Sequence, residues 1–283
     1  MKSDRLESPE DFPSLRRIDF DDYEQDLSIK IGRALEEIRG RLSVSQASMA
    51  HGFGVTVGQY RKYEAGIDMP KLHASARWSI ISGVPIAMLF HKTRYVDFLE
   101  INECDIELIP LYHTIANATD HVFYSGLKLV FQDSSWPVQE ELRQCTALDS
   151  SLDGIGEQYC QVLSKNLESA RASLALGKAD MAEWLGIATN TYSRYVCESK
   201  KGSMPVYLYA RIAAVSGAKQ SWAMCGETTY SKLALKRDIR IQILKSLLSI
   251  EKGGRLQAIK GLFSHIGLNL SMYNNPAMPM LNH

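Results

Sequence analysis

The chain has 283 residues, of which 45% are hydrophobic and 23% charged, and its 32 basic and 32 acidic residues cancel to a net charge of zero. This composition is typical of a globular protein of one to three domains, and the lack of any run of about 18 apolar residues excludes a membrane-spanning helix. The first residues lack the apolar centre of a signal peptide, and the five scattered cysteines resemble free thiols in a reducing compartment, so the sequence predicts a cytoplasmic protein.

The N-terminal stretch is acidic. Residues 1–26 hold nine acidic and four basic side chains with few apolar ones, which predicts a mobile tail or a loosely docked arm. Two interpretations remain open: a solvated leader, or an arm that competes with nucleic acid for a basic surface of the same protein. After it, apolar residues recur at helical spacing from Ile31 to Leu42, and Ser28 is the expected N-cap of that helix.

Residues 46–64 predict two short helices joined by a tight turn. Gly54 falls where the backbone must become left-handed, which costs a glycine least, and Thr56 is placed to cap the second helix. The inward-facing apolar residues are Met49, Phe53, Val55, Tyr60 and Tyr63. The outer side of the second helix carries Val57, Gly58, Gln59, Arg61 and Lys62. This arrangement is typical of a helix-turn-helix whose second helix enters the DNA major groove.

The same pattern recurs in residues 178–196, with the apolar positions offset by 132 residues from those of the first copy. The matching residues are Met181, Leu185, Ile187, Tyr192 and Tyr195, with Gly186 at the turn. Downstream, Met69-Pro70 and Ala76-Arg77 recur as Met204-Pro205 and Ala210-Arg211, at offsets of 135 and 134. Two matches at a nearly fixed offset indicate an internal duplication.

Residues 31–90 resemble the DNA-binding domain of phage-repressor or Cro-type (XRE-family) helix-turn-helix regulators. The residues that carry the resemblance are Ile31-Gly32, Leu35, Arg39, Ser45-Gln46, Met49-Ala50, Gly54-Val55-Thr56, Tyr60, Tyr63-Glu64, Gly66 and Pro70. The resemblance implies a five-helix domain in which Arg39 pairs with Glu64, and breaking such a pair costs about 3–5 kcal/mol. The second copy departs from the pattern, because Lys178 replaces a glutamine and Val196 replaces the glutamate, which leaves Arg171 without that partner.

We therefore expect a mainly α fold with two five-helix, repressor-type helix-turn-helix domains, the first completed by helices near residues 71–82 and 85–99. The expected divisions are an acidic N-terminal arm (1–26), helix-turn-helix domain 1 (27–90), a folded spacer (91–152), helix-turn-helix domain 2 (153–226) and a helical C-terminal extension (227–283). The spacer is too apolar to stay in solvent, although residues 121–131 fit either a helix or a strand. Apolar residues from Ile239 to Ile250 predict a wide helix face that packs against the core or a second chain.

If both copies bind DNA, the side chains on their outer faces divide between reading bases and contacting phosphates. The expected base-reading residues are Val57, Gln59, Thr189, Asn190, Thr191, Ser193 and Arg194. The expected phosphate contacts are Gln46, Thr56, Arg61, Lys62, Lys178, Lys200 and Lys201. The DNA site would then consist of two non-identical half-sites about one helical turn apart. The alternative is that one copy has become a protein-contact surface.

The sequence thus predicts a bacterial, phage or mobile-element transcriptional regulator that binds double-stranded DNA, with a homodimer binding a longer site. The alternative is an antitoxin or anti-activator adaptor that grips a regulatory protein, which the zero net charge favours slightly. The charge is unevenly spread, however, since residues 227–261 hold eight bases and three acids.

We expect no enzymatic activity, metal or cofactor. The seven histidines are scattered rather than paired at metal-binding spacing, and no glycine-rich phosphate fingerprint follows a predicted strand. Ser125 and Lys128 are close in sequence, as in self-cleaving repressors, but the peptidase domains of such repressors are β-rich and C-terminal, whereas the C-terminal region here is predicted to be helical.

Overall fold

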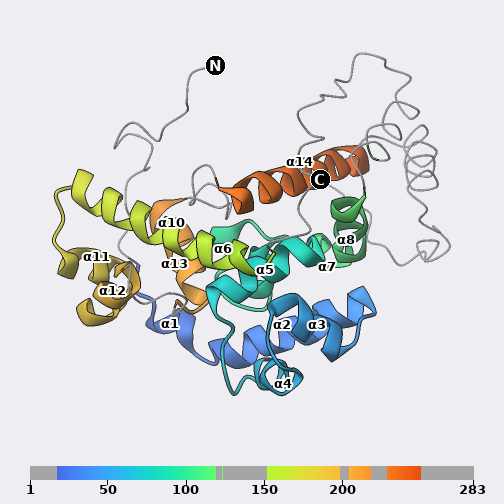
Figure 1. Ribbon diagram of the computed structural model, residues 1–283, viewed down its shortest axis with the longest axis horizontal. Coiled ribbons are helices and arrows are strands. Elements are labelled where there is room, and N and C mark those ends of the chain that lie inside the picture. The colour runs from blue at the N-terminus through green and yellow to red at the C-terminus, as the bar shows by residue number, and fades with distance from the viewer. Residues whose placement is uncertain (1–17, 119–122, 124–151, 198–203, 218–227, 250–283) are drawn as a thin grey trace, which may run out of the picture.

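The computed structural model describes residues 18–118, 123, 152–197, 204–217 and 228–249 (Figure 1). Within those ranges the fold is mainly α, as expected, and contains no β-strand. None of the helices there is both long and apolar enough to cross a lipid bilayer. The features expected at Lys200, Lys201, Ser125 and Lys128, and nearly all of residues 121–131, lie outside the described residues.

The first unit, residues 27–90, follows the short helix α1 (Asp21–Glu24). Its elements are α2 (Leu27–Leu42), α3 (Gln46–Phe53), α4 (Val57–Glu64), α5 (Leu72–Ser82) and the 3-10 helix η2 (Ile86–Phe90). The expected N-cap at Ser28 is wrong, because α2 begins at Leu27 after Asp26, which is left-handed and forms no side-chain cap. Leu27 is itself buried and extends the apolar stripe of α2 by one turn, so the helix starts earlier than its polar residues indicate.

The single helix expected over residues 85–99 is also wrong. The structure has η2 and, separately, α6 (Val96–Leu99). The buried Thr93 divides them, since its hydroxyl donates to the Phe90 carbonyl at 2.7 Å and accepts from the Tyr95 N–H at 3.2 Å. Such local side-chain bonds give the backbone an alternative to helical hydrogen bonding.

The rest of the described chain is helical as well. Its elements are α7 (Glu103–Glu107), α8 (Ile109–Asn117), α10 (Leu152–Ser173), α11 (Lys178–Trp184), α12 (Thr189–Val196), α13 (Tyr207–Ser216) and α14 (Thr229–Ser249). The second unit comprises α10 to α13, and the position of its expected fifth helix lies outside the described residues.

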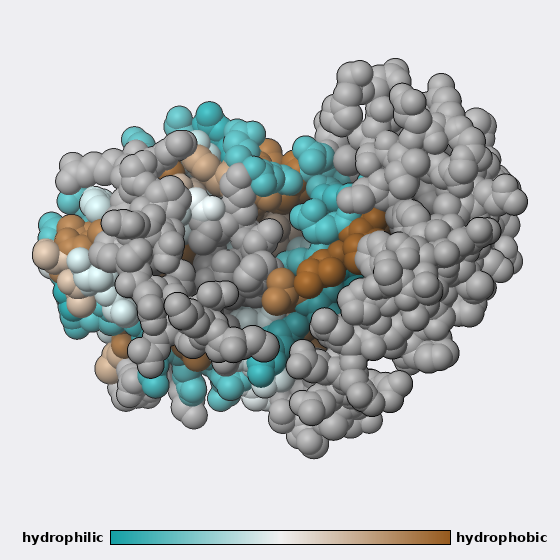
Figure 2. All heavy atoms as spheres, turned by 90° about the horizontal axis from the view of Figure 1, so that it is seen from above, coloured by the Kyte–Doolittle hydropathy of each residue, from teal (hydrophilic) through white to brown (hydrophobic). Residues whose placement is uncertain are grey.

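Helix α14 packs one face against the spacer and leaves another face exposed. Arg240 is buried and donates from Nη1 to the carbonyls of Ile115 and Ala118, each at 2.8 Å, at the C-terminal end of α8. Leu235 and Ile239 point outward and are 37% and 45% exposed. Figure 2, viewed from the side on which α14 lies, shows a hydrophobic strip bordered by hydrophilic side chains.

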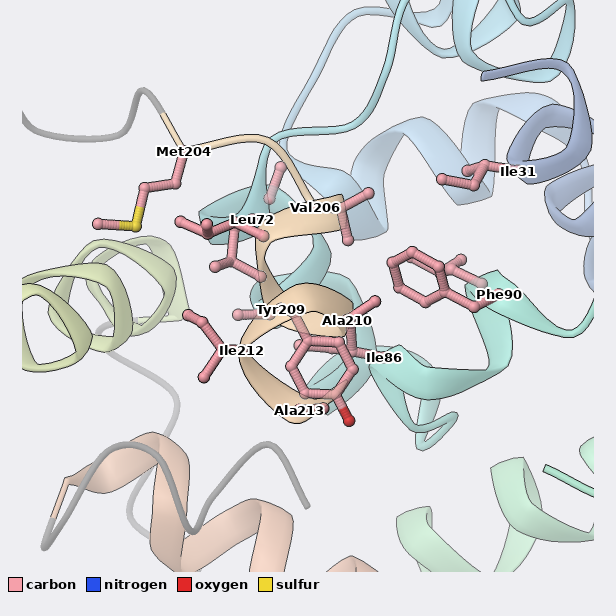
Figure 3. Packing of buried hydrophobic residues seen from close by; sticks show 14 of the residues in the cluster. Ile31, Leu72, Ile86, Phe90, Met204, Val206, Tyr209, Ala210, Ile212 and Ala213 are labelled. Carbon is pink, nitrogen blue, oxygen red and sulfur yellow. The ribbon is translucent and has the colours of Figure 1, made fainter. Parts of the chain in front are cut away.

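The two units share one hydrophobic core rather than forming separate globules. Buried side chains from α2 through α14 belong to one continuous cluster. Figure 3 shows Leu72 and Ile86 of the first unit beside Val206 and Tyr209 of the second. Phe90 also meets Tyr209, with ring centroids 6.2 Å apart. The orientation of one unit relative to the other is therefore fixed by apolar packing.

The loops that follow α4 and α12 pair with each other. The Leu72 N–H donates to the Met204 carbonyl at 2.8 Å, and the Val206 N–H donates to the Pro70 carbonyl at 3.0 Å, forming an antiparallel bridge. These are the segments that match in the sequence as Met-Pro pairs. Antiparallel pairing of two equivalent segments is the local geometry of a two-fold, self-complementary interface.

Equivalent positions in the two units share unusual backbone conformations. Gly54 and Gly186, at the turns before α4 and α12, have φ of 69° and 63°. Ser43 and Ala175, which end the preceding helices α2 and α10, have φ of 54° and 52° although neither is glycine. A left-handed non-glycine residue is uncommon, so its recurrence at an offset of 132 residues gives the duplication a structural counterpart.

The crossing of α5 and α10 is close enough to make a glycine on α10 irreplaceable. A Cβ added at Gly156 would lie 2.0 Å from the His73 carbonyl oxygen, a backbone atom that cannot move without moving α5. We expect Gly156→Ala to destabilise the fold by about 1–3 kcal/mol. Gly154, on the same helix, has open space at its Cβ position, so Gly154→Ala should be neutral or stabilising by up to about 1 kcal/mol. Urea denaturation of the pair tests this, and equal stability of the two variants would contradict the close crossing.

The acidic N-terminal arm is packed where it is described. Phe20 is only 3% exposed, and the Arg211 guanidinium carbon lies 4.7 Å from the centroid of its ring. Glu24 forms an ion pair with the same Arg211. Residues 18–26 are thus docked on the second unit rather than forming a mobile tail, while residues 1–17 lie outside the described residues.

Candidate nucleic-acid interface

The turn between α3 and α4 has the geometry that its sequence predicts. Gly54 is left-handed and ends α3. The Thr56 hydroxyl accepts a hydrogen bond from the Gln59 N–H at 3.2 Å and so caps α4. The buried residues on the inner faces are Met49, Phe53, Tyr60 and Tyr63, and Val55 is half-buried.

An arginine from a later helix secures each turn from behind. Arg77 on α5 donates from Nη1 to the Gly52 carbonyl at 2.7 Å, at the C-terminal end of α3. Arg211 on α13 donates from Nη1 to the carbonyls of Leu185 and Gly186, at 2.7 and 2.6 Å. Both arginines satisfy helix-terminal carbonyls that have no partner within the helix.

The outer face of α4 is accessible, with one exception among its expected contact residues. Arg61 and Lys62 are exposed, and Val57 is half-buried. Gln59 is half-buried, and its Nε2 donates to the Asp68 carboxylate at 2.6 Å. Reading an adenine with both edges of the Gln59 amide therefore requires this bond to be exchanged.

Glu64, at the C-terminal end of α4, is the centre of a hydrogen-bonded cluster. Arg39 donates to it from Nε at 2.6 Å, Gln46 from Nε2 at 2.6 Å, and the Tyr60 hydroxyl at 2.8 Å. The ion pair implied by the family resemblance is thus present, and it ties α4 to α2. Gln46 also accepts from Arg61 at 3.1 Å, so this expected phosphate contact is engaged within the protein.

The same cluster makes stability depend on pH. Burial alone would raise the pKa of Glu64, but the hydrogen bonds from Arg39, Gln46 and Tyr60 outweigh it and hold that pKa below its usual value. A carboxylate with a lowered pKa in the folded state contributes stability above its unfolded pKa and loses it as the pH falls through the folded value.

Accordingly, Glu64→Gln is expected to lower the free energy of unfolding at neutral pH by about 1–3 kcal/mol and to flatten its decline in acid. Chemical denaturation at a series of pH values from about 7 down to about 3 measures both effects. Glu36→Gln, an exposed position on the same side of α2, is the control and should keep the wild-type profile. An unchanged acid profile in Glu64→Gln would contradict the role assigned to the cluster.

The second unit holds its recognition helix differently. Val196 provides no carboxylate, and Arg171 pairs instead with Glu168, with Nε and Nη2 each 3.2 Å from a carboxylate oxygen. The Tyr192 hydroxyl donates to Glu168 at 2.7 Å, as Tyr60 does to Glu64. The carboxylate thus comes from α10 and not from α12. Sequence reasoning missed Glu168, although its spacing of three residues from Arg171 on a helix was a usable signal.

The outer face of α12 is open to solvent. Thr189, Asn190 and Arg194 are exposed, while Thr191 and Ser193 are half-buried. None of the hydrogen bonds found in the described residues engages the side chains of Asn190 and Arg194. The guanidinium carbon of Arg194 lies 5.5 Å from the centroid of the Tyr195 ring, which positions it without neutralising it.

Helix α11 has a mixed electrostatic character. Lys178 is exposed at its start, as expected for a phosphate contact. Asp180 and Glu183 are exposed on the same helix, and Asp180 accepts from the Gly177 N–H at 2.8 Å. These two acids stand where the first unit has Ser48 and His51, so the second unit is less suited to a phosphate backbone along this helix.

In Figure 1, α4 lies at the bottom of the molecule and α12 at its left end. No family model, curated protein or solved structure matches this chain. Within the described residues, no group of three or more His, Cys, Asp or Glu side chains is arranged to hold a metal ion. The candidate interface is therefore defined by two solvent-facing helices on buried scaffolds, one rich in cations and the other in neutral hydrogen-bonding groups.

Proposed function

We propose that this chain is a sequence-specific regulator of transcription that binds double-stranded DNA with two reading helices, α4 and α12. The observation that carries the proposal is the repeated contrast between a buried inner face and an open outer face on these two helices. Tyr60 and Tyr192 anchor them to the preceding scaffold. Polar side chains are held out into solvent on both, as major-groove recognition requires.

The two helices divide the work of recognition. Gln59 is bonded to Asp68, and Arg61 and Lys62 are cations suited to phosphates, so α4 contributes mainly affinity. Asn190 and Arg194 on α12 can form bidentate bonds to adenine and guanine, so α12 contributes mainly sequence preference. The DNA site is then asymmetric, with one stringent and one permissive half.

Selection of bound sequences from random DNA, followed by affinity measurements over a salt series, tests the proposal. We expect an enriched motif, a linear fall of log affinity with log salt, and specific binding at least about 1,000-fold tighter than binding to random DNA. A protected region spanning two half-sites supports the two-headed version, and one half-site alone contradicts it. Absence of any enriched motif would overturn sequence-specific binding.

A protein-gripping adaptor, such as an antitoxin or anti-activator, is the second candidate. The zero net charge and the exposed Asp180 and Glu183 on α11 favour it. Replacing these two acids by Asn and Gln separates the candidates. If α11 lies along phosphates, the double variant should bind DNA several-fold more tightly at low salt, whereas an adaptor should gain no DNA affinity.

A further inference from the structure

A cavity of about 510 Å³ lies between the spacer, both units and α14, apart from the outer faces of α4 and α12. The turn at Pro85 and helix η2 form one side, Tyr209 on α13 another, and Arg237, Ile241 and Lys245 on α14 a third. The volume falls within the range of small-molecule sites, which have mostly apolar walls and a few placed polar groups. The proposed DNA-binding function gives this cavity no role.

A buried guanidinium with an unused donor lines the cavity. The Arg237 side chain is 4% exposed. Its Nε donates to the Asp238 carboxylate at 2.8 Å, but Nη1 is 3.4 Å from both oxygens of Ser79. Nη2 lies 2.8 Å from the same Asp238 oxygen without the alignment of a hydrogen bond, and it has no hydrogen-bond partner among the described residues. Buried donors are nearly always satisfied, so an under-used guanidinium on a cavity wall indicates a place for an anionic group.

The opposite end of the cavity is already satisfied. Asp105 is 3% exposed, and it accepts from the Tyr112 hydroxyl at 2.6 Å and from the Asn102 N–H at 3.0 Å. Lys245 lies 2.5 Å from the same carboxylate. Asp105 and Lys245 therefore neutralise each other and leave Arg237, Asp238 and Glu100 to set the local charge.

Both signs of charge thus meet an apolar wall. Of the charged side chains that line the described cavity, two are basic and three are acidic, so a simple anion gains little from the site as a whole. A simple cation would face the buried Arg237. A ligand that carries both charges satisfies both, and Met88, Leu99, Ile101 and Ile241 offer contacts to an apolar body.

We propose that this cavity binds a small zwitterion with an apolar side chain, the chemistry of an aliphatic or aromatic α-amino acid. Its carboxylate lies at Arg237 and its ammonium group at Asp238. Its side chain packs on Met88 and Ile241. Because the walls come from η2, α13 and α14, the ligand contacts both units at once. Binding depends on the cavity alone and is measured without DNA.

Isothermal titration of the full chain with L-leucine and L-phenylalanine tests the proposal, with 4-methylpentanoate and 3-methylbutylamine as probes that each keep one charge. We expect saturable binding of at least one of the two amino acids, and at least about tenfold weaker binding of both single-charge probes, a difference of about 1.4 kcal/mol. Failure of both amino acids to bind would overturn the proposal. Binding of the carboxylate probe as tight as that of L-leucine would overturn the zwitterion assignment in favour of an anion site.

Two substitutions on α14 locate the ligand. Gln242 is exposed and lines the cavity, so Gln242→Trp should obstruct it and weaken binding at least about tenfold without changing the melting temperature of the free protein. Lys232→Trp, exposed on the same helix but outside the cavity, is the control and should bind as the wild type does. Unchanged affinity in Gln242→Trp would place the amino acid elsewhere and overturn the site. Arg237→Met is less informative alone, because a buried residue of this size also supports the fold.

Discussion

A chain carrying both Asn190→Ala and Arg194→Ala is expected to bind its selected DNA sequence about 30-fold to about 10,000-fold more weakly than the wild type. Each bidentate contact between a side chain and a base discriminates by about 1–3 kcal/mol, and the two side chains lie one helical turn apart on the open face of α12. Affinity for random DNA should change much less, since only the arginine also contributes charge. The measurement is a competition assay with selected and random duplexes.

The matched control removes the same number of side chains from the other reading helix. Arg61→Ala with Lys62→Ala on α4 should weaken binding to every sequence alike and reduce the slope of log affinity against log salt by about one for each lost phosphate contact. If this control relaxed sequence preference while the α12 variant preserved it, the division of labour between the helices would be wrong.

Phe20→Ala is expected to lower the free energy of unfolding by about 3–5 kcal/mol, the usual cost of emptying a buried aromatic site. The ring packs on the Arg211 guanidinium, and a Cβ at Gly186 would lie 2.7 Å from it, so the loss opens a cavity at the turn before α12. Urea denaturation monitored by circular dichroism measures the effect. Asp21→Ala, an exposed position in α1, is the control and should stay within about 0.5 kcal/mol.

The variant also tests whether the arm supports the second unit. Arg211 holds the carbonyls that end α11, and Phe20 and Glu24 hold Arg211. Hydrogen exchange in Phe20→Ala should therefore rise first in α11 and α12, before it rises in α3 and α4. Equal loss of protection in both units would mean that the arm supports only the common core.

Local features could be predicted from the sequence because their causes are local. The apolar period from Ile31 to Ile38 gives α2, and the glycine at position 54 and the threonine at 56 give the turn and the cap. The helical extension follows in the same way, with Ile241 and Leu244 buried. In each case the deciding contacts lie within a few residues of each other along the chain.

What the sequence did not reveal depends on contacts between distant segments. The docking of Phe20 near Gly186, the bond from Gln59 to Asp68 and the shared core each need the folded arrangement. Two units with complete apolar sets suggest two globules, and only the close crossing of α5 and α10 joins them. Long-range packing of this kind has no period in the sequence.

The backbone bridge at Pro70 and Pro205 has a consequence for concentration. Two halves that pair within one polypeptide face each other at a fixed effective molarity, so their association does not weaken on dilution as that of a dissociable pair does. A mutation also enters only one half at a time, which frees the halves to diverge. The carboxylate that meets the anchoring tyrosine, supplied by Glu64 in one half and by Glu168 in the other, records such a divergence.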